Sequence, residues 1–141
     1  MKTQKIFLSS LLIIGSTFMN CTSDDNENMD ETAPTISIIS PELDQTYVAE
    51  WGGAWPEGEP VTLKAKGIDD VKISTIIVTV TNSSGDIVFE KTIENVSNNE
   101  KEFIVSEDYI SADQDVYTVI FTARDSSGNI GTSTPRTFTY I

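Results

Sequence analysis

Three kinds of side chain in this 141-residue chain could carry chemistry: one thiol, many carboxylates and two indoles. The chain has a single cysteine, Cys21, and no histidine, against 22 aspartates and glutamates. With one thiol there is no internal disulfide and no cysteine metal cluster. Without histidine there is no imidazole base and no zinc ligand set of the usual kinds. The chemistry that remains is acylation of the cysteine, cation binding by carboxylates and aromatic stacking.

Cys21 follows a short apolar segment that has the pattern of a secretory signal. Lys2 and Lys5 precede an uncharged apolar run over residues 6–19, which is shorter than the roughly 20 residues that span a bilayer. The four residues 18–21 resemble a lipobox, the motif at which signal peptidase II cleaves before an acylated cysteine. The alternative is an ordinary secreted protein with an accidental cysteine, but no small-x-small cleavage site precedes residue 21. We therefore expect a cleaved signal peptide over residues 1–20 and lipidation at Cys21.

The next residues predict an acidic tether over residues 21–33. Its Ser23-Asp24-Asp25 run, followed by Asn26-Glu27, resembles the acidic export signal of surface lipoproteins of the Bacteroidota. That resemblance implies a protein anchored in the outer membrane and facing outward. A segment with so few apolar residues cannot bury enough surface to offset its ordering entropy, so it predicts a flexible connection between the lipid and a domain.

The charge of the chain limits its partners. The net charge is −13, and removal of residues 1–20 takes away two lysines and no acid. Nucleic acid and anionic lipid surfaces both require a basic face, so they are poor partners. A cationic partner or a divalent metal ion is permitted, while the simpler interpretation is that acidity keeps an exposed protein soluble.

Residues 34–141 must supply the scaffold, and their pattern is that of strands. Apolar and polar residues alternate with period two, β-branched residues dominate, and turns rich in Gly, Asn and Ser separate the runs. The sequence predicts an all-β fold, a seven-stranded β-sandwich. The expected strands cover residues 35–40, 61–66, 73–81, 86–93, 102–106, 116–124 and 131–140.

Three sequence landmarks resemble bacterial immunoglobulin-like (cadherin-like) domains. The pattern from Tyr117 to Asn129, Y-x-V-x-F-x-A-x-D-x-x-G-N, is similar to their penultimate strand and its turn. The segment from Ala33 to Pro41 is similar to their first strand, and residues 67–70 fall at their Ala-x-Asp loop. The resemblance implies an immunoglobulin-like β-sandwich over residues 34–141, in which Asp125 accepts hydrogen bonds from the amides of the turn that follows it.

The same resemblance implies one candidate cofactor, calcium. Immunoglobulin-like and cadherin-like domains often hold a divalent ion where the N-terminal linker meets the loops between strands. In this chain the implied ligands are Asp69, Asp70 and Asp125, with Asp30 and Glu31 from the linker. The alternative is no cofactor at all, since calcium needs six to eight oxygens and some clustering among 22 acids is expected by chance.

The segment 43–60 is the candidate contact surface. It contains Tyr47 and both tryptophans, Trp51 and Trp55, among glycines and prolines. Such rings stack on sugars or anchor a protein partner; alternatively they cover one end of the sandwich. Glu50 and Glu57 are the only carboxylates placed for hydrolysis, and a small sandwich offers them little cleft, so we expect no enzyme. The expected function is a lipid-anchored, non-catalytic binding module for a glycan or envelope protein. The alternative is a structural or accessory spacer subunit with no ligand of its own.

Overall fold

The computed structural model describes residues 30–49, 58–97 and 101–141. The expected signal peptide, the lipidation site Cys21 and both tryptophans, Trp51 and Trp55, lie outside the described residues. The described residues cover the expected sandwich, apart from residues 50–57 and 98–100, and the last four residues of the expected tether.

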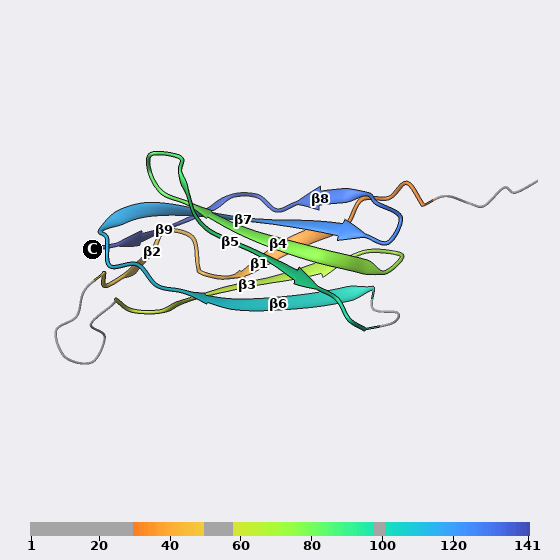
Figure 1. The fold of residues 1–141 in the computed structure, drawn as a ribbon, viewed down its shortest axis with the longest axis horizontal. Helices are drawn as coiled ribbons and strands as arrows, with labels where there is room; N and C mark the ends of the chain where they lie inside the picture. The colour runs from red at the N-terminus through yellow and green to blue at the C-terminus, as the bar shows by residue number, and fades with distance from the viewer. Residues whose placement is uncertain (1–29, 50–57, 98–100) are drawn as a thin grey trace, which may run out of the picture.

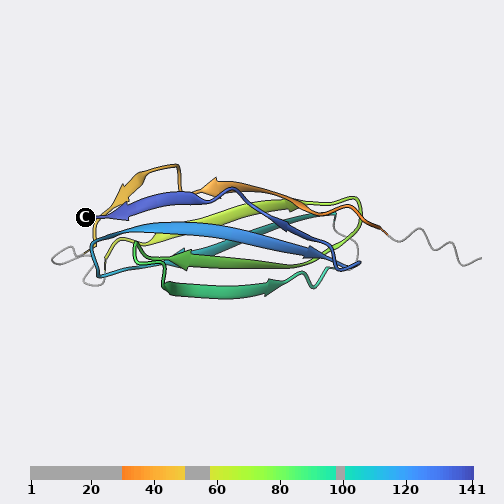
Figure 2. The ribbon, with the colours of Figure 1, turned by 90° about the horizontal axis from the view of Figure 1, so that it is seen from above.

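The described residues form two layers of strands that face each other (Figures 1 and 2). One sheet has the order β1-β3-β6, and the other has the order β2-β9-β7-β4-β5 with β8 paired to β7. The neighbouring strands are antiparallel except for β2 and β9, which run parallel. No helix that could cross a membrane occurs in the described ranges. The strands are β1 (Thr35–Ser40), β2 (Gln45–Tyr47), β3 (Val61–Ile68), β4 (Ile73–Thr81), β5 (Ile87–Glu94), β6 (Glu102–Tyr109), β7 (Asp115–Asp125), β8 (Ile130–Thr132) and β9 (Arg136–Tyr140).

The predicted all-β sandwich is confirmed, with a different strand count. Nine strands occur in the described residues, against seven predicted. Strand β2 was not predicted, because three residues are too few to show a period of two. The predicted last strand is two strands, β8 and β9, separated at Ser133–Pro135. Pro135 has no amide hydrogen for a sheet ladder, so pairing with β7 stops and restarts across it.

The core lies between the two layers and follows the alternation of the strands. Val61, Leu63 and Ala65 of β3 are fully buried, while the residues between them are exposed or half-buried. Strands β4 and β7 repeat this pattern from the facing sheet. The buried side chains of these two strands are Ile73, Ile76, Val78, Val80, Tyr117, Val119, Phe121 and Ala123, together with Asp125 at the end of β7.

An aromatic cluster closes the end of the sandwich that lies opposite Asp30. All four tyrosines of the chain are buried there around Phe138, with ring centroids 5.6 to 6.2 Å apart. The Tyr140 hydroxyl donates to the carbonyl oxygens of Glu59, at 2.6 Å, and Tyr109, at 3.2 Å. The cluster thus ties β9 to the residues that precede β3 and to the last residue of β6.

This cluster predicts a loss of stability in alkali. Burial raises the pKa of Tyr140 to about 12 and also raises the pKa of Tyr109, whereas tyrosines of the unfolded chain titrate near ~10. The unfolded state therefore loses protons first, and the free energy of unfolding falls as the pH rises above ~10. Denaturant unfolding at several pH values, with tyrosinate absorbance read on the folded protein, measures both quantities. Tyr140→Phe should flatten the dependence and cost about 1 kcal/mol of hydrogen bonding. Ordinary tyrosine titration in the folded state would contradict the prediction.

Candidate metal centre

Three carboxylates from distant parts of the chain meet at the end of the sandwich where the N-terminal segment joins it. Asp30 precedes β1, Asp69 follows β3 and Asp125 ends β7. One oxygen from each lies within 4.8 Å of the others. Figure 1 shows this end on the right, where the start of β1 lies beside the β3–β4 and β7–β8 connections. Residues 39 and 56 positions apart in sequence are therefore brought together because β3 and β7 both end here.

Asp125 is held by the turn that follows β7. Its Oδ1 accepts the amide hydrogens of Gly128, at 2.6 Å, and Asn129, at 2.8 Å. Its Oδ2 accepts from the side-chain amide of Asn129, at 2.8 Å. Gly128 has φ of +99°, a left-handed conformation that glycine adopts without strain. The hydrogen bond predicted from Asp125 to the turn is confirmed, and it fixes the carboxylate of a residue that is only 2% exposed.

Asp69 is the one residue of the cluster whose hydrogen bonding is incomplete. Its Oδ1 accepts the amide hydrogen of Val71 at 3.0 Å, and its own amide donates to the carbonyl of Lys101 at 2.9 Å. Its Oδ2 is buried and has no hydrogen-bond partner. Every other buried side-chain oxygen or nitrogen of the described residues has one. Leaving such an atom unpaired costs free energy, and the residue is 7% exposed. The orphaned oxygen is what a bound cation would satisfy.

Asp30 is joined to the domain through Asn129. The Asn129 side-chain amide donates to the Asp30 carbonyl oxygen at 2.9 Å and to its Oδ2 at 3.3 Å. Next to it, the chain passes so close to β8 that a Cβ on Gly131 would lie 1.7 Å from the Pro34 carbonyl oxygen. Within the described residues, the segment from Asp30 to Pro34 is therefore held against the domain. The Gly128-Asn129 pair was visible in the sequence, but its second role, holding the linker, was not.

The electrostatics of the cluster favour a cation. Burial raises the pKa of Asp69, and the neighbouring carboxylates of Asp125, Asp30 and Asp70 raise it further. For Asp125 burial also acts to raise the pKa, but hydrogen bonds from Asn129 and from the turn amides outweigh it, so the pKa is lowered. At neutral pH the folded protein thus holds negative charges together at a cost that a divalent ion would remove.

The donor set fits calcium. Oxygens bound to one calcium ion at 2.3–2.6 Å lie at most about 5 Å apart, and the three carboxylate oxygens satisfy that limit. Calcium takes hard oxygen ligands in flexible geometry and fills its shell with water, whereas magnesium demands a smaller and near-ideal octahedron. Asp30, Asp69 and Asp125 would hold the ion, and its charge would fix the linker to the two loops.

Other predicted site residues lie elsewhere. Asp70, in the bend that follows β3, is exposed and lies outside the cluster. Glu31 is exposed as well. Tyr47 is only 6% exposed, and its ring packs against Phe138 and Tyr140. It belongs to the core, which corrects its assignment to a contact surface. The positions of Trp51 and Trp55, its predicted companions, are not described.

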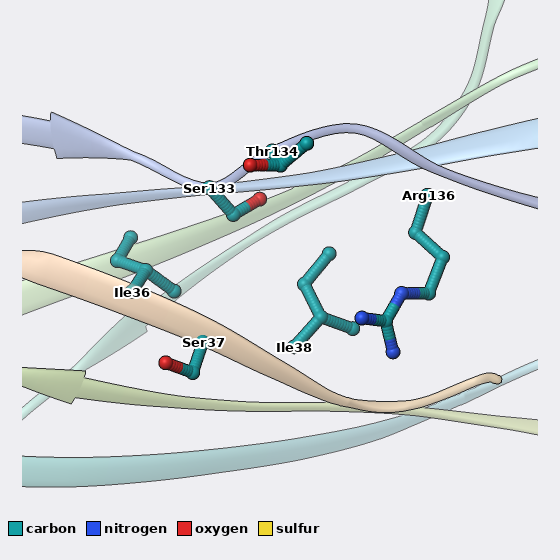
Figure 3. Close-up of a pocket in the computed structure, with 6 residues that line it drawn as sticks. All are labelled: Ile36, Ser37, Ile38, Ser133, Thr134 and Arg136. Carbon is teal, nitrogen blue, oxygen red and sulfur yellow. The ribbon is translucent and has the colours of Figure 1, made fainter. Parts of the chain in front are cut away.

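A separate hollow of about 260 Å³ lies along the edge of the sandwich, between β1 and the β8–β9 connection. Figure 3 shows Arg136 extending toward Ile38 across it, and the Arg136 Nη1 donates to the Pro41 carbonyl oxygen at 2.9 Å. The hollow exists because β1 pairs with β3 and leaves its other edge free. The guanidinium bridges the two layers there, which is a structural role.

Comparison with known proteins defines no family. No protein-family model and no curated protein matches the chain. An engineered protein solved by the Northeast Structural Genomics Consortium is similar in fold, with a TM-score of 0.50 and 16% identity over 77% of this chain and 20% of that chain. The β-glucuronidase of Bacteroides uniformis gives a TM-score of 0.38 and 11% identity over 77% of this chain and 13% of that chain. The chain thus matches at most a fifth of the length of these proteins, and the likeness concerns the fold alone.

The cluster predicts an unusual pH dependence in chelator. Because the pKa of Asp69 is raised, its unfavourable contribution disappears as the pH falls from neutral through that pKa; the contribution of Asp125, whose pKa is lowered, is lost only in stronger acid, below about pH 4. Metal-free wild type should therefore gain stability toward mild acid before losing it. Asp69→Asn should be at least as stable as wild type at neutral pH and lack this gain. Asp70→Asn, an exposed neighbour, is the matched control. Stability that falls steadily from pH 7 downward in wild type would disprove the account.

Proposed function

We propose that this chain is a lipid-anchored, non-catalytic binding domain on the outside of the outer membrane, with calcium joining its tether to its sandwich. The observation that carries the calcium assignment is the buried, unpartnered Oδ2 of Asp69, in a carboxylate that has an oxygen within 4.8 Å of oxygens of Asp30 and Asp125. The lipid anchor at Cys21 and the outward orientation rest on the sequence of residues 1–33. The ion would fix the orientation of the sandwich relative to its tether, because Asp30 belongs to the tether and the other two ligands belong to the sandwich.

The layout of the sandwich supports a binding role at its other end. The start of β1 lies at one end, while the end of β2 and the start of β3, the strands on either side of residues 50–57, lie at the opposite end (Figures 1 and 2). A domain tethered at the start of β1 would hold those ends of β2 and β3, which flank the tryptophan-containing segment, away from the lipid. Residues there could reach a glycan or a protein partner.

The residues that flank this segment are firmly held. The Glu59 amide donates to the Val48 carbonyl oxygen at 2.8 Å, and the Ala49 amide donates to that of Ile141 at 3.0 Å. Gly58 has φ of +105°, and a Cβ there would lie 2.5 Å from the Ala49 carbonyl oxygen. Only glycine suits this close approach. A segment that leaves from a rigid base loses less entropy when it binds.

The sandwich is further proposed to be of the immunoglobulin-like type. Support comes from the Tyr117 to Asn129 pattern, which occupies β7 and its turn as the resemblance implies: Tyr117, Val119, Phe121 and Ala123 are buried, and Asp125 caps the turn. The alternative function for the protein is that of a spacer or accessory subunit. The same layout, with the tether at one end of the sandwich, would suit that function.

Calcium should stabilise the mature chain carrying Cys21→Ser, which removes the acylation site. An ion that binds only the folded state with the millimolar or submillimolar affinity of extracellular modules should raise Tm by about 5 °C or more at tenfold excess over Kd. Thermal unfolding with calcium, magnesium or chelator measures the effect. Asp69→Asn should abolish it, and Asp70→Asn should retain it. An equal rise in Tm for wild type and Asp69→Asn would rule out the proposed site.

The tryptophan-containing segment should bind the partner. Trp51→Ala with Trp55→Ala is expected to weaken binding at least about tenfold, since indoles dominate binding hot spots, while Tm stays within a few degrees. Glycan arrays and pull-down from envelope extracts provide the partner, and Val96→Ala, 88% exposed, is the control. A large loss of Tm would show that the indoles are core residues. Wild-type chain that retains no glycan or protein would favour the spacer function.

A further inference from the structure

Cationic side chains gather at the acidic end of an otherwise acidic protein. The described residues contain seven lysines and arginines. Lys66 and Lys91 form ion pairs with Glu102 and Glu107. Three others, Lys72, Lys101 and Arg124, border hollows at the end that carries the metal centre, and no ion pair to them occurs within the described residues.

Lys72 and Lys101 border the same hollow, of about 410 Å³, together with Asp70, Val71 and Ser126. Main-chain hydrogen bonds fix its walls. The Asp69 amide donates to the Lys101 carbonyl oxygen at 2.9 Å, and the Ser126 amide donates to that of Lys72 at 2.8 Å. Three chain segments are thereby held around one space, and two lysines and one aspartate are among the residues that line it.

A second hollow, of about 510 Å³, lies on the other side of Ser126. It is bordered by hydroxyl groups and by one guanidinium, that of Arg124. The Arg124 Nη2 would lie 3.5 Å from a Cβ on Gly128, so the side chain extends along the turn after β7. The residues on its border are Ser74, Thr75, Arg124, Asp125, Ser126, Ser127 and Gly128.

We propose that the hollow between Lys72 and Lys101 binds an oxyanion carried by a saccharide, a carboxylate or a phosphate. The ammonium groups supply charge and donors, Asp70 can accept hydrogen bonds from sugar hydroxyls, and the Ser126 hydroxyl can accept from or donate to them. This inference rests on the proposed function, because it names the class of glycan as acidic and adds a second contact site at the tethered end of the sandwich.

The hollow is coupled to the metal centre through shared residues. The Asp69 main-chain amide donates to the Lys101 carbonyl oxygen, and Asp125 immediately precedes Ser126. Without a cation, the negative charges of Asp30, Asp69 and Asp125 repel an arriving anion. A divalent ion neutralises most of that negative charge and so weakens the repulsion. Calcium should therefore tighten binding of the anion roughly threefold or more at low ionic strength.

The test is calorimetric titration of the mature Cys21→Ser chain with trigalacturonate, a carboxylated trisaccharide, and with neutral maltotriose. In calcium, trigalacturonate should bind and maltotriose should bind at least about tenfold more weakly. Lys72→Gln with Lys101→Gln should weaken trigalacturonate binding at least about tenfold, since two charge-assisted contacts are lost. Lys64→Gln with Lys66→Gln, on the outer face of β3, removes the same charge and should change affinity less than twofold.

Two results would overturn the inference: no binding of trigalacturonate to wild type, or an equal loss in the two double variants, which would mean that net charge alone attracts the ligand. The measurements distinguish failure of this inference from failure of the proposed function. A calcium-dependent rise in Tm without trigalacturonate binding rejects the hollow and keeps the metal centre. Trigalacturonate binding that depends on Lys72 and Lys101 but is unchanged by calcium keeps the hollow and rejects its coupling to the metal centre.

Discussion

Two carboxylates buried at one end of a sandwich, those of Asp69 and Asp125, are the constraint on which the rest of that end depends. A buried carboxylate must be hydrogen-bonded, paired or ligated. Asp125 meets the requirement with the amides of its own turn and with Asn129. Asp69 meets half of it, through Val71, and leaves Oδ2 without a partner. Asp30 adds a third negative charge instead of a positive one. A bound cation would remove this electrostatic cost, and the same cation would hold the tether in place.

The sandwich brings these residues together because β3 and β7, which belong to different sheets, end at the same end. Their buried faces pack against each other along the whole domain, from the tyrosines at one end to Asp125 at the other. The two ends are therefore different in kind. The tyrosine end is closed by aromatic rings and their hydroxyl hydrogen bonds. The aspartate end is closed by polar turns, and the negative charges of its three aspartates are not balanced by a positive charge within the cluster. The proposed tether and the proposed cation site fall at the second end, and the flanks of the tryptophan-containing segment fall at the first.

Much of the fold could be predicted from the sequence, because alternation of apolar residues reports burial directly. Strand β4 has the predicted bounds, and β1 does as well. Strand β2 escaped prediction because pairing with β9, not its own pattern, makes it a strand. Strand β8 was predicted as part of one strand with β9, although the two are separate. Asp69 and Asp125 could be chosen from their motif, but choosing Asp30 over Asp70 required knowing which side of the chain faces the turn. Tyr47 was misassigned because an aromatic residue beside glycines and tryptophans has the composition of a contact surface, while its burial comes from Phe138 and Tyr140, ninety residues away in the chain. The hollow at Lys72 and Lys101 has no sequence signature, because main-chain hydrogen bonds between three loops create it.

The central claim, that a calcium ion belongs between Asp30, Asp69 and Asp125, is tested most directly by a crystal structure of the mature chain grown with calcium, with anomalous scattering used to locate the ion. The account predicts one strong peak with the Asp69 Oδ2 and oxygens of Asp30 and Asp125 at about 2.3–2.6 Å from it. A structure in which Asp69 Oδ2 accepts a hydrogen bond from a water molecule or a neighbouring side chain, with calcium absent from the cluster at millimolar concentration, would contradict it.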